Sequence, residues 1–190
     1  MDKFRNKYRI LSARLQNWDY GWNAAYFVTI CTVNRECHFG NIKNGEMNLM
    51  EIGKKADEYW LEIPEHFPFV KLDVHVVMPN HVHGIIIINK TDDGRVRRTV
   101  ETQNFASLQM PSTPESPQPG NKFGPQSQNL ASIIRGYKTG VTKYARINNI
   151  HFAWQSRFYD HIIRNDAEYQ RIKKYIINNP KKWNDDSLNT

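Results

Sequence analysis

Two apolar, β-branched runs at residues 74–78 and 82–88 constrain the fold of this chain more than any other stretch. Val and Ile fit the pleated surface of a sheet, and the intervening Pro79 and Asn80 are typical turn residues. The segment therefore predicts a hairpin of two central strands. With 190 residues, 39% of them hydrophobic, the chain is long enough to bury a core on this hairpin within one domain.

His81 and His83 lie two residues apart in the second strand of the hairpin. Successive side chains of a strand point to opposite faces, so both imidazoles share one face and Val82 takes the other. Neutral imidazoles on a rigid strand can converge on one divalent metal ion. An isolated His-x-His is more often a polar pair on a half-exposed face, so a metal site requires a further ligand from elsewhere in the chain.

The charge and the aromatic content favour a nucleic acid as partner. Lys and Arg number 26 against 19 Asp and Glu, the formal net charge is +7, and 12% of the residues are aromatic. Basic groups bind phosphates and rings stack on unpaired bases, although rings also fill ordinary cores. The composition is a bias toward nucleic acid and does not require it.

Two other classes of protein are disfavoured. Cys31 and Cys37 are the only cysteines and form no Cys-x-x-Cys pattern, which argues against a zinc ribbon or a disulfide framework. No apolar run reaches the ~18 residues that a membrane span requires, and residues 1–5 lead into no apolar signal segment. We expect a soluble protein of the reducing cytoplasm that has no membrane partner.

Periodicity and turn residues predict alternating strands and helices in the remaining chain. Helical spacing of apolar residues ends at Pro64 and again at Pro180, and Asn44-Gly45 is a strong hairpin signal. In chain order the predicted elements are a strand at 25–33, a small hairpin at 38–50, a helix at 51–60, the central hairpin from residue 69, an amphipathic helix at 130–146, a strand in the second half of 151–163, and a last helix capped by Asn165 that runs to about Asn179.

Two segments are predicted to be additions to a single domain of residues 1–190. Residues 1–20 interleave basic and aromatic side chains and predict a basic N-terminal arm, which either contacts DNA or is a frayed terminus. Residues 91–128 contain five prolines among Ser, Thr and Gln. This stretch can bury too little apolar surface to offset its ordering entropy, so we expect a flexible insertion.

The last helix carries a second candidate group. One stripe of this helix contains Tyr169, Ile172, Ile176 and Asn179, and Tyr175 lies at its edge, four residues before Asn179. If that stripe packs on the sheet, the phenol and the amide point toward the two histidines, where a phenolate could attack a phosphodiester polarised by a metal ion. The competing interpretations are a core tyrosine with a bonded hydroxyl and a helix-terminal asparagine before proline.

Three stretches carry a resemblance to a known family. They read Val-Val-Met-Pro-Asn-His-Val-His-Gly at 76–84, Trp-Gln-Ser-Arg-Phe-Tyr-Asp-His-Ile-Ile-Arg-Asn at 154–165, and Tyr-Ile-Ile-Asn-Asn-Pro at 175–180. In this order they resemble the REP-associated tyrosine transposases, the single-tyrosine branch of the HUH nucleases. The resemblance runs from about residue 26 to 183 and is poorest in the proline-rich stretch.

This resemblance implies an α+β fold, a ferredoxin-like sandwich with a central antiparallel sheet and covering helices. It implies that His81 and His83 bind Mg²⁺ or Mn²⁺ and that Tyr175 is the nucleophile. The implied activity is that of a metal-dependent single-stranded DNA endonuclease and strand transferase, which acts on palindromic hairpin repeats through a 5′-phosphotyrosine. Relatives in the wider family work as monomers or as homodimers.

The third metal ligand is less well defined. By the resemblance, Asn179 stands where relatives place a polar ligand, which in many HUH enzymes is Gln or Glu. Asparagine is shorter than glutamine by one methylene, so its coordination could pass through water, or Asp73 or His75 could take its place if their strand faces the site.

The DNA contacts and the activity have alternatives as well. A non-catalytic DNA- or RNA-binding regulator on the same fold is the rival function, because fold does not fix function. His161 matches a family signature without an assigned chemical role. The candidate DNA-binding residues are Arg135, Lys138, Lys143, Arg146, Arg157, Arg164 and His161.

Overall fold

The computed structural model describes residues 3–4, 7–8, 15, 18–90 and 127–189. Most of the predicted N-terminal arm and nearly all of the predicted 91–128 insertion lie outside these residues. Within the described part of the chain, no helix is both long and apolar enough to cross a membrane.

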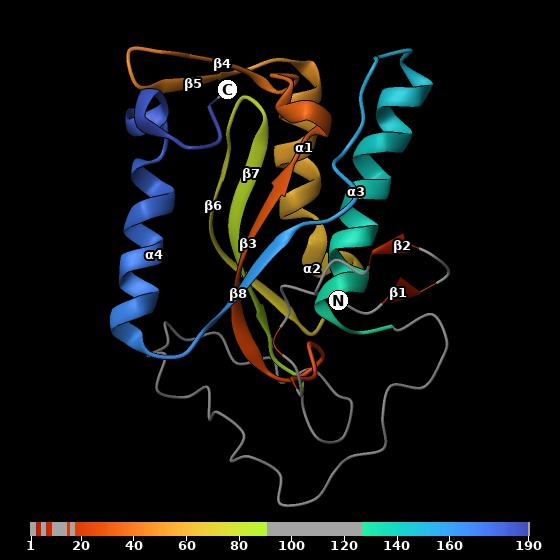
Figure 1. Cartoon of the computed structure of the whole chain (residues 1–190), viewed down its shortest axis with the longest axis vertical. Coiled ribbons are helices and arrows are strands. Elements are labelled where there is room, and N and C mark those ends of the chain that lie inside the picture. Colours follow the sequence, from red (N-terminus) through yellow and green to blue (C-terminus); the bar gives the residue numbers. More distant parts are fainter. Residues whose placement is uncertain (1–2, 5–6, 9–14, 16–17, 91–126, 190) are drawn as a thin grey trace, which may run out of the picture.

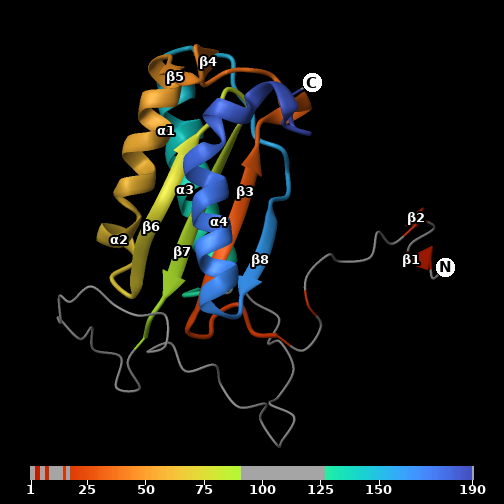
Figure 2. The ribbon, with the colours of Figure 1, turned by 90° about the vertical axis from the view of Figure 1, so that its left-hand side faces the viewer.

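A four-stranded antiparallel sheet forms the centre of the molecule, with the strand order β6-β7-β3-β8. Helices α1 and α3 cover one face of this sheet, and α4 lies on the other (Figures 1 and 2). The order β3-α1-β6-β7-α3-β8 along the chain, with β3 and β7 in the middle of the sheet, is the ferredoxin-like α+β sandwich. The predicted fold class is therefore confirmed.

The helices and strands have the following bounds. They are β1 Lys3–Phe4 and β2 Lys7–Tyr8, which pair with each other; β3 Ala24–Cys31; the 3-10 helix η1 Val33–Arg35; β4 Gly40–Lys43 and β5 Glu46–Leu49; α1 Glu51–Leu61; α2 Ile63–His66; β6 Val70–Val77; β7 His81–Ile88; α3 Leu130–Ile147; β8 Tyr159–Ile163; α4 Asp166–Asn178; and the 3-10 helix η3 Pro180–Asp185.

Local sequence signals account for several of these boundaries. Asn44 and Gly45 adopt φ values of 54° and 76°, the left-handed conformation that a two-residue hairpin turn between β4 and β5 requires. The Asn129 side chain accepts a hydrogen bond from Ser132 N at 2.9 Å and begins α3. Asn165 caps α4 in the same way, as predicted.

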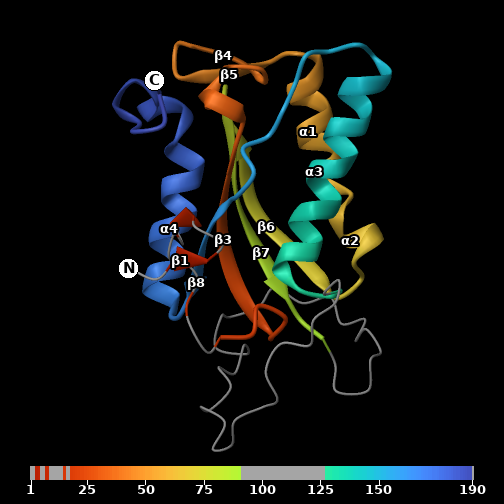
Figure 3. The ribbon, with the colours of Figure 1, turned by 45° about the vertical axis from the view of Figure 1, so that its right-hand side comes forward.

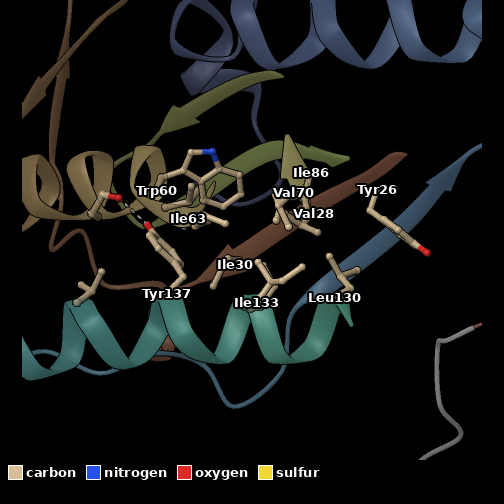
Figure 4. Close-up of a cluster of buried hydrophobic side chains, with 14 of the residues drawn as sticks. Tyr26, Val28, Ile30, Trp60, Ile63, Val70, Ile86, Leu130, Ile133 and Tyr137 are labelled. Atoms are coloured by element: carbon tan, nitrogen blue, oxygen red, sulfur yellow. Dashed lines mark hydrogen bonds between the residues drawn. The ribbon is translucent and has the colours of Figure 1, made fainter. Parts of the chain in front are cut away.

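The main core lies between the sheet and the helices α1 and α3 (Figures 3 and 4). Its largest side chain is Trp60 of α1, which is fully buried against the sheet, and Tyr137 of α3 donates its hydroxyl to the Ala56 carbonyl at 3.0 Å. A smaller apolar cluster under α4 contains Ile85, Ile172 and Ile176. The two faces of the sheet are thus unequal in apolar content.

Strand β6 contains a bulge. Leu72 pairs with Ile86 and His75 pairs with Gly84, so β6 advances three residues where β7 advances two. One residue is therefore additional on β6, and the alternation of faces changes at this point. Strand β7 itself pairs regularly with β3 along its whole length.

Packing of Trp60 on β7 gives the first prediction. A Cβ added at Gly84 would lie 2.2 Å from Trp60 Cζ2, whereas a Cβ added at Gly140 in α3 would lie 3.5 Å from the Tyr59 ring. Overpacking a filled core costs about 1–3 kcal/mol, so we expect Gly84→Ala to lower the free energy of unfolding by this amount. Urea unfolding at neutral pH measures it.

Gly140→Ala is the matched control. It adds the same methyl group at an ordinary contact distance. It also reduces the conformational entropy that a helical glycine loses on folding, so we expect it to raise the free energy of unfolding by about 0.5–1 kcal/mol. Equal effects of the two substitutions would contradict the packing described here.

Candidate active site

The two histidines lie next to each other on the α4 face of β7. His81 is opposite Cys31 and His83 is opposite Thr29 in the pairing of β7 with β3, and their ring centroids are 4.4 Å apart. Both are buried, with exposed fractions of 0% and 2%. The shared face follows from the two-residue period of a strand, as expected from the sequence.

Hydrogen bonds fix the orientation of the His81 ring. The Asn80 amide nitrogen donates to the carbonyls of Arg35 at 3.0 Å and Leu188 at 2.8 Å, so its oxygen faces His81. That oxygen lies 2.7 Å from His81 Nδ1 and can only accept, which places the imidazole proton on Nδ1. Nε2 therefore presents a lone pair, and this buried atom has no hydrogen-bond partner among the described residues.

His83 is held between β3 and α4. Its Nδ1 lies 2.8 Å from the Thr29 hydroxyl, and its Nε2 lies 3.2 Å from the Tyr175 hydroxyl. Burial, and then the nearby Arg35, lower the pKa of His81 from 6.5 to about 3. Burial and the neighbouring His81 hold the pKa of His83 well below 6.5. Both imidazoles are uncharged at neutral pH, which is the form that binds metal ions.

Helix α4 brings Tyr175 and Asn179 to these histidines. Tyr175 is 43% exposed, and burial of its ring, followed by the charge of Asp186, raises the pKa of its hydroxyl, while a hydrogen bond from Asn179 lowers it. Asn179 is buried, and its amide nitrogen donates to Asp186 Oδ2 at 3.1 Å. Its amide oxygen is buried and has no hydrogen-bond partner in the described part of the chain. The phenol of Tyr175 and the amide of Asn179 therefore lie beside the two imidazoles, as expected from the sequence.

Asp186 is a member of the site that the sequence did not predict. One carboxylate oxygen and one nitrogen each from His81 and His83 lie within 4.8 Å of one another. Asp186 follows η3, and the next residues are held in place: the Arg35 guanidinium donates to the Ser187 carbonyl at 2.9 Å. An irregular segment after a helix has no periodicity from which the direction of its side chains can be predicted. The only sequence signal for Asp186 was a carboxylate that follows the basic Lys181-Lys182 tail.

The alternative ligands Asp73 and His75 are not at the site. His75 points to the opposite face of the sheet, where its Nε2 lies 2.8 Å from Asp57 Oδ1 and its ring stacks on Trp60. The Asp73 carboxylate accepts hydrogen bonds from Tyr169 and Lys173 of α4. That alternative is wrong, because His75 is held by α1 on the opposite face and Asp73 is held by two side chains of α4, so neither belongs to the cluster of His81, His83 and Asp186.

A cleft of about 810 Å³ lies beside the histidines and Tyr175. Its walls come from β3, β8, α4 and the C-terminal segment, and they combine cations with aromatic rings. The lining residues are Phe27, Thr29, Cys31, Arg35, His83, Gln155, Arg157, Phe158, Tyr159, His161, Arg171, Ile172, Tyr175, Ser187 and Leu188. Guanidinium groups and rings around an open cleft suit a single nucleic-acid strand.

The predicted DNA-binding residues are divided between two hollows. Arg157 and His161 line the cleft just described. A second hollow of about 680 Å³ follows the exposed side of α3, and its cations are Arg135, Lys138, Lys143 and Arg146. Phe158 lines both hollows, so they approach each other at the β8 edge of the sheet. Arg164 is exposed and lines neither of them.

Two of these residues have structural partners. The Lys138 ammonium donates to the carbonyls of Gln155 at 2.7 Å and Arg157 at 3.0 Å, and burial lowers its pKa to about 8. His161 Nε2 lies 2.8 Å from Glu168 Oε1 in the first turn of α4. Both side chains connect neighbouring segments of the chain. These bonds are structural and differ from the phosphate contacts that the sequence predicted for them.

The residues at the site fit a divalent cation. They offer two neutral imidazoles, a carboxylate and an amide oxygen, which are ligand types found at metal centres. Among the residues that the structure describes, the buried Nε2 of His81 and the buried amide oxygen of Asn179 lack partners, whereas buried polar atoms are normally hydrogen-bonded. A cation bound at this position would give both of these atoms a partner.

Comparisons with known proteins identify relatives in sequence. No family model matches the chain. A Haemophilus influenzae protein without an assigned function is 41% identical over 178 residues, which cover 93% of this chain and 91% of the relative. A second H. influenzae protein, provisionally named a REP-associated tyrosine transposase, is 25% identical over 118 residues, 62% of this chain and 53% of that protein.

A solved structure of a REP-associated tyrosine transposase bound to a REP hairpin has the same fold. Its TM-score is 0.56 at 18% identity, and the match covers 92% of this chain and 74% of that chain. The chain therefore belongs to one family with the 41% identical Haemophilus influenzae protein, and the resemblance to the REP-associated tyrosine transposases predicted from its three motifs is confirmed.

Proposed function

We propose that this chain is a metal-dependent single-stranded DNA endonuclease and strand transferase that acts on palindromic hairpin repeats through a 5′-phosphotyrosine at Tyr175. The observation that carries the proposal is the distance of 3.2 Å between the Tyr175 hydroxyl and His83 Nε2, beside the unpaired Nε2 of buried His81. A nucleophile and a cation site that meet in this way are the two parts that covalent phosphodiester cleavage requires.

The metal ion would be held by His81, His83 and Asp186, with the amide oxygen of Asn179 as a fourth candidate ligand. When bound, Mg²⁺ or Mn²⁺ would supply Lewis-acid polarisation of the scissile phosphate. Mn²⁺ accepts imidazole nitrogen more readily than Mg²⁺, which prefers oxygen ligands, so the donor set favours Mn²⁺.

The chain's own residues account for the remaining steps. The Tyr175 oxygen loses its proton and forms a bond to phosphorus, the bond from phosphorus to the 3′ oxygen breaks, and the leaving 3′ oxygen takes up a proton. The 5′ phosphate stays on the protein, so the energy of the phosphodiester is conserved for rejoining and no nucleotide cofactor is consumed. The exposed face of Tyr175 and the adjoining cleft leave access for a strand.

A hairpin substrate is supported by the fold and by the distribution of cations. The solved structure with the same fold is bound to a REP hairpin. In this chain the cleft at Tyr175 suits an unpaired strand, and the basic hollow along α3 suits the phosphates of a paired stem. The two hollows approach each other at Phe158, and the junction between the stem and the single strand of the substrate would lie there.

Tyr175→Phe should abolish the covalent adduct and leave hairpin binding intact, because it removes the attacking oxygen and keeps the ring packed against Phe27. Incubation with 3′-labelled single-stranded substrate, Mn²⁺ and a denaturing gel should give a labelled protein band for the wild type. With 5′-labelled substrate the label should be released as free DNA.

Tyr159→Phe is the control, since Tyr159 lines the same cleft and contacts the same Phe27 ring but has no histidine partner in the geometry described above. It should form the adduct as the wild type does. An adduct that carries the 5′ label, or that persists in Tyr175→Phe, would contradict the assignment. DNA binding by the wild type without any adduct would favour the non-catalytic regulator.

Asp186→Asn should weaken Mn²⁺ binding and cleavage together, because it removes the charge of a ligand. It keeps an oxygen that can accept the hydrogen bond that Asp186 Oδ1 receives from the Leu188 amide at 2.8 Å. Changes in the groups around metal ligands alone cost about 10–100-fold in affinity, so we expect at least a tenfold loss. Calorimetric titration with Mn²⁺ measures it without any assay of activity.

Asp185→Asn provides the same loss of charge one residue away, outside the three-residue cluster. It should bind Mn²⁺ as the wild type does. The ligand assignment fails if the two variants have equal affinity, and His81→Ala should then be compared with both.

Hairpin binding should weaken steeply as salt rises, because Lys and Arg contacts release counterions from DNA. Arg157→Gln should reduce the slope of log K against log salt by about 1, as expected for one lost phosphate contact. Lys71→Gln changes the net charge equally at the exposed far edge of the sheet and should leave the slope unchanged. Equal slopes for the two variants would show that Arg157 contacts no phosphate.

A further inference from the structure

An acidic side chain lies on the α4 face of the sheet at the bulge of β6. Before the bulge, Leu72 packs into the main core; after it, Val74 and Val76 pack into the cluster under α4. Asp73 contacts α4 as Val74 does, so two consecutive residues share one face. Asp73 keeps the alternation that follows Leu72, whereas the additional residue turns His75 toward α1, so Asp73 and His75 lie on opposite faces although they are two residues apart.

Asp73 holds two donors of α4 at once. Lys173 Nζ lies 2.9 Å from Oδ1 and 3.1 Å from Oδ2, and the Tyr169 hydroxyl donates to Oδ2. Tyr169 and Lys173 are four residues apart and therefore follow one another on the same side of the helix. The Asp73 and Lys173 side chains are only 20% and 34% exposed, so solvent screens this contact less than it would a surface ion pair.

Apart from the bonds of the site residues Tyr175 and Asn179 themselves, the other described contacts of α4 define its rotation weakly. Its buried side chains in the small cluster are Ile172 and Ile176, and apolar contacts of this kind are not directional. Glu168, in the first turn, bonds to His161 of β8 on the other side of the helix. Besides the contact of Tyr175 itself, the contact with Asp73 is the described polar link from α4 to the sheet that is nearest to Tyr175 along the helix, with Lys173 only two residues before it. Strand β6 lies on the other side of α4 from β8 (Figure 2).

We propose that Asp73 is a positioning residue for Tyr175: by clamping Tyr169 and Lys173 to the bulge of β6, it sets the rotation of α4 and so keeps the Tyr175 oxygen beside His83. This proposal rests on the proposed function for its catalytic consequence. The clamp itself is a property of the folded chain and can be measured separately.

The test compares Asp73→Ala with Asp57→Ala. Asp57 is the matched control because it pairs at 2.8 Å with His75, two residues further along the same strand, but on the opposite face of the sheet. Two readouts are taken well below the melting temperature of each variant: amide hydrogen exchange in residues 166–178, and the single-turnover rate of adduct formation at saturating hairpin DNA and Mn²⁺.

We expect Asp73→Ala to speed exchange in α4 and to slow adduct formation by about tenfold to a hundredfold, since small displacements of a reacting group carry costs of this size. The dissociation constants for hairpin DNA and Mn²⁺ should stay within about twofold, because Asp73 is outside both sites. Asp57→Ala should lower the melting temperature and change neither α4 exchange nor the rate.

Two further variants separate positioning from general destabilisation. Tyr169→Phe combined with Lys173→Met should slow adduct formation as much as Asp73→Ala does, and adding Asp73→Ala to this pair should cause no further loss. Asp73→Asn keeps an acceptor for Tyr169 but loses the charge that attracts Lys173, so its rate should lie between those of the wild type and Asp73→Ala.

Unchanged α4 exchange in Asp73→Ala would overturn the clamp. Faster exchange with an unchanged rate would overturn its role in positioning Tyr175, and so would an equal loss of rate in Asp57→Ala. Absence of an adduct in the wild type would instead refute the proposed activity and with it the catalytic consequence, while the exchange measurement would still decide whether Asp73 holds α4.

Discussion

Two uncharged imidazoles buried in the middle of a sheet are the constraint on which the rest of this structure depends. A buried polar nitrogen is costly unless it has a partner. The Nδ1 atoms of His81 and His83 receive partners from Asn80 and Thr29, which belong to the neighbouring turn and strand. The Nε2 atom of His83 lies beside Tyr175 of α4, and that of His81 has no partner among the described residues, so the chemistry of the site begins from these two atoms.

The bonds that orient His81 also bring two distant segments of the chain to it. Asn80 can accept from His81 because its amide nitrogen is occupied by the carbonyls of Arg35 and Leu188. The same two contacts tie the loop after β3 and the C-terminal segment to the turn before β7. Asp186 reaches the histidines as a consequence, because the residues that follow it are fixed by these bonds.

The two faces of the sheet have separate tasks. Most of the apolar burial lies under α1 and α3, with Trp60 and Tyr137 at its centre, and this face supplies the stability of the fold. The α4 face has a small apolar cluster and several polar contacts, and it carries the candidate site. Directional hydrogen bonds such as those of Asp73 are suited to this face, because a helix held by few apolar side chains needs them to keep its orientation.

Much of this arrangement follows from local patterns in the sequence. The period of a strand places His81 and His83 together, the period of a helix places Tyr175 near Asn179, and the Asn-Gly pair and Asn165 mark a turn and a cap, because these effects act over a few neighbouring residues. The bulge in β6 decided that His75 faces α1 while Asp73, two residues earlier, faces α4. Asp186 was brought to the histidines by contacts between segments more than a hundred residues apart, a distance over which no periodicity in the sequence carries information.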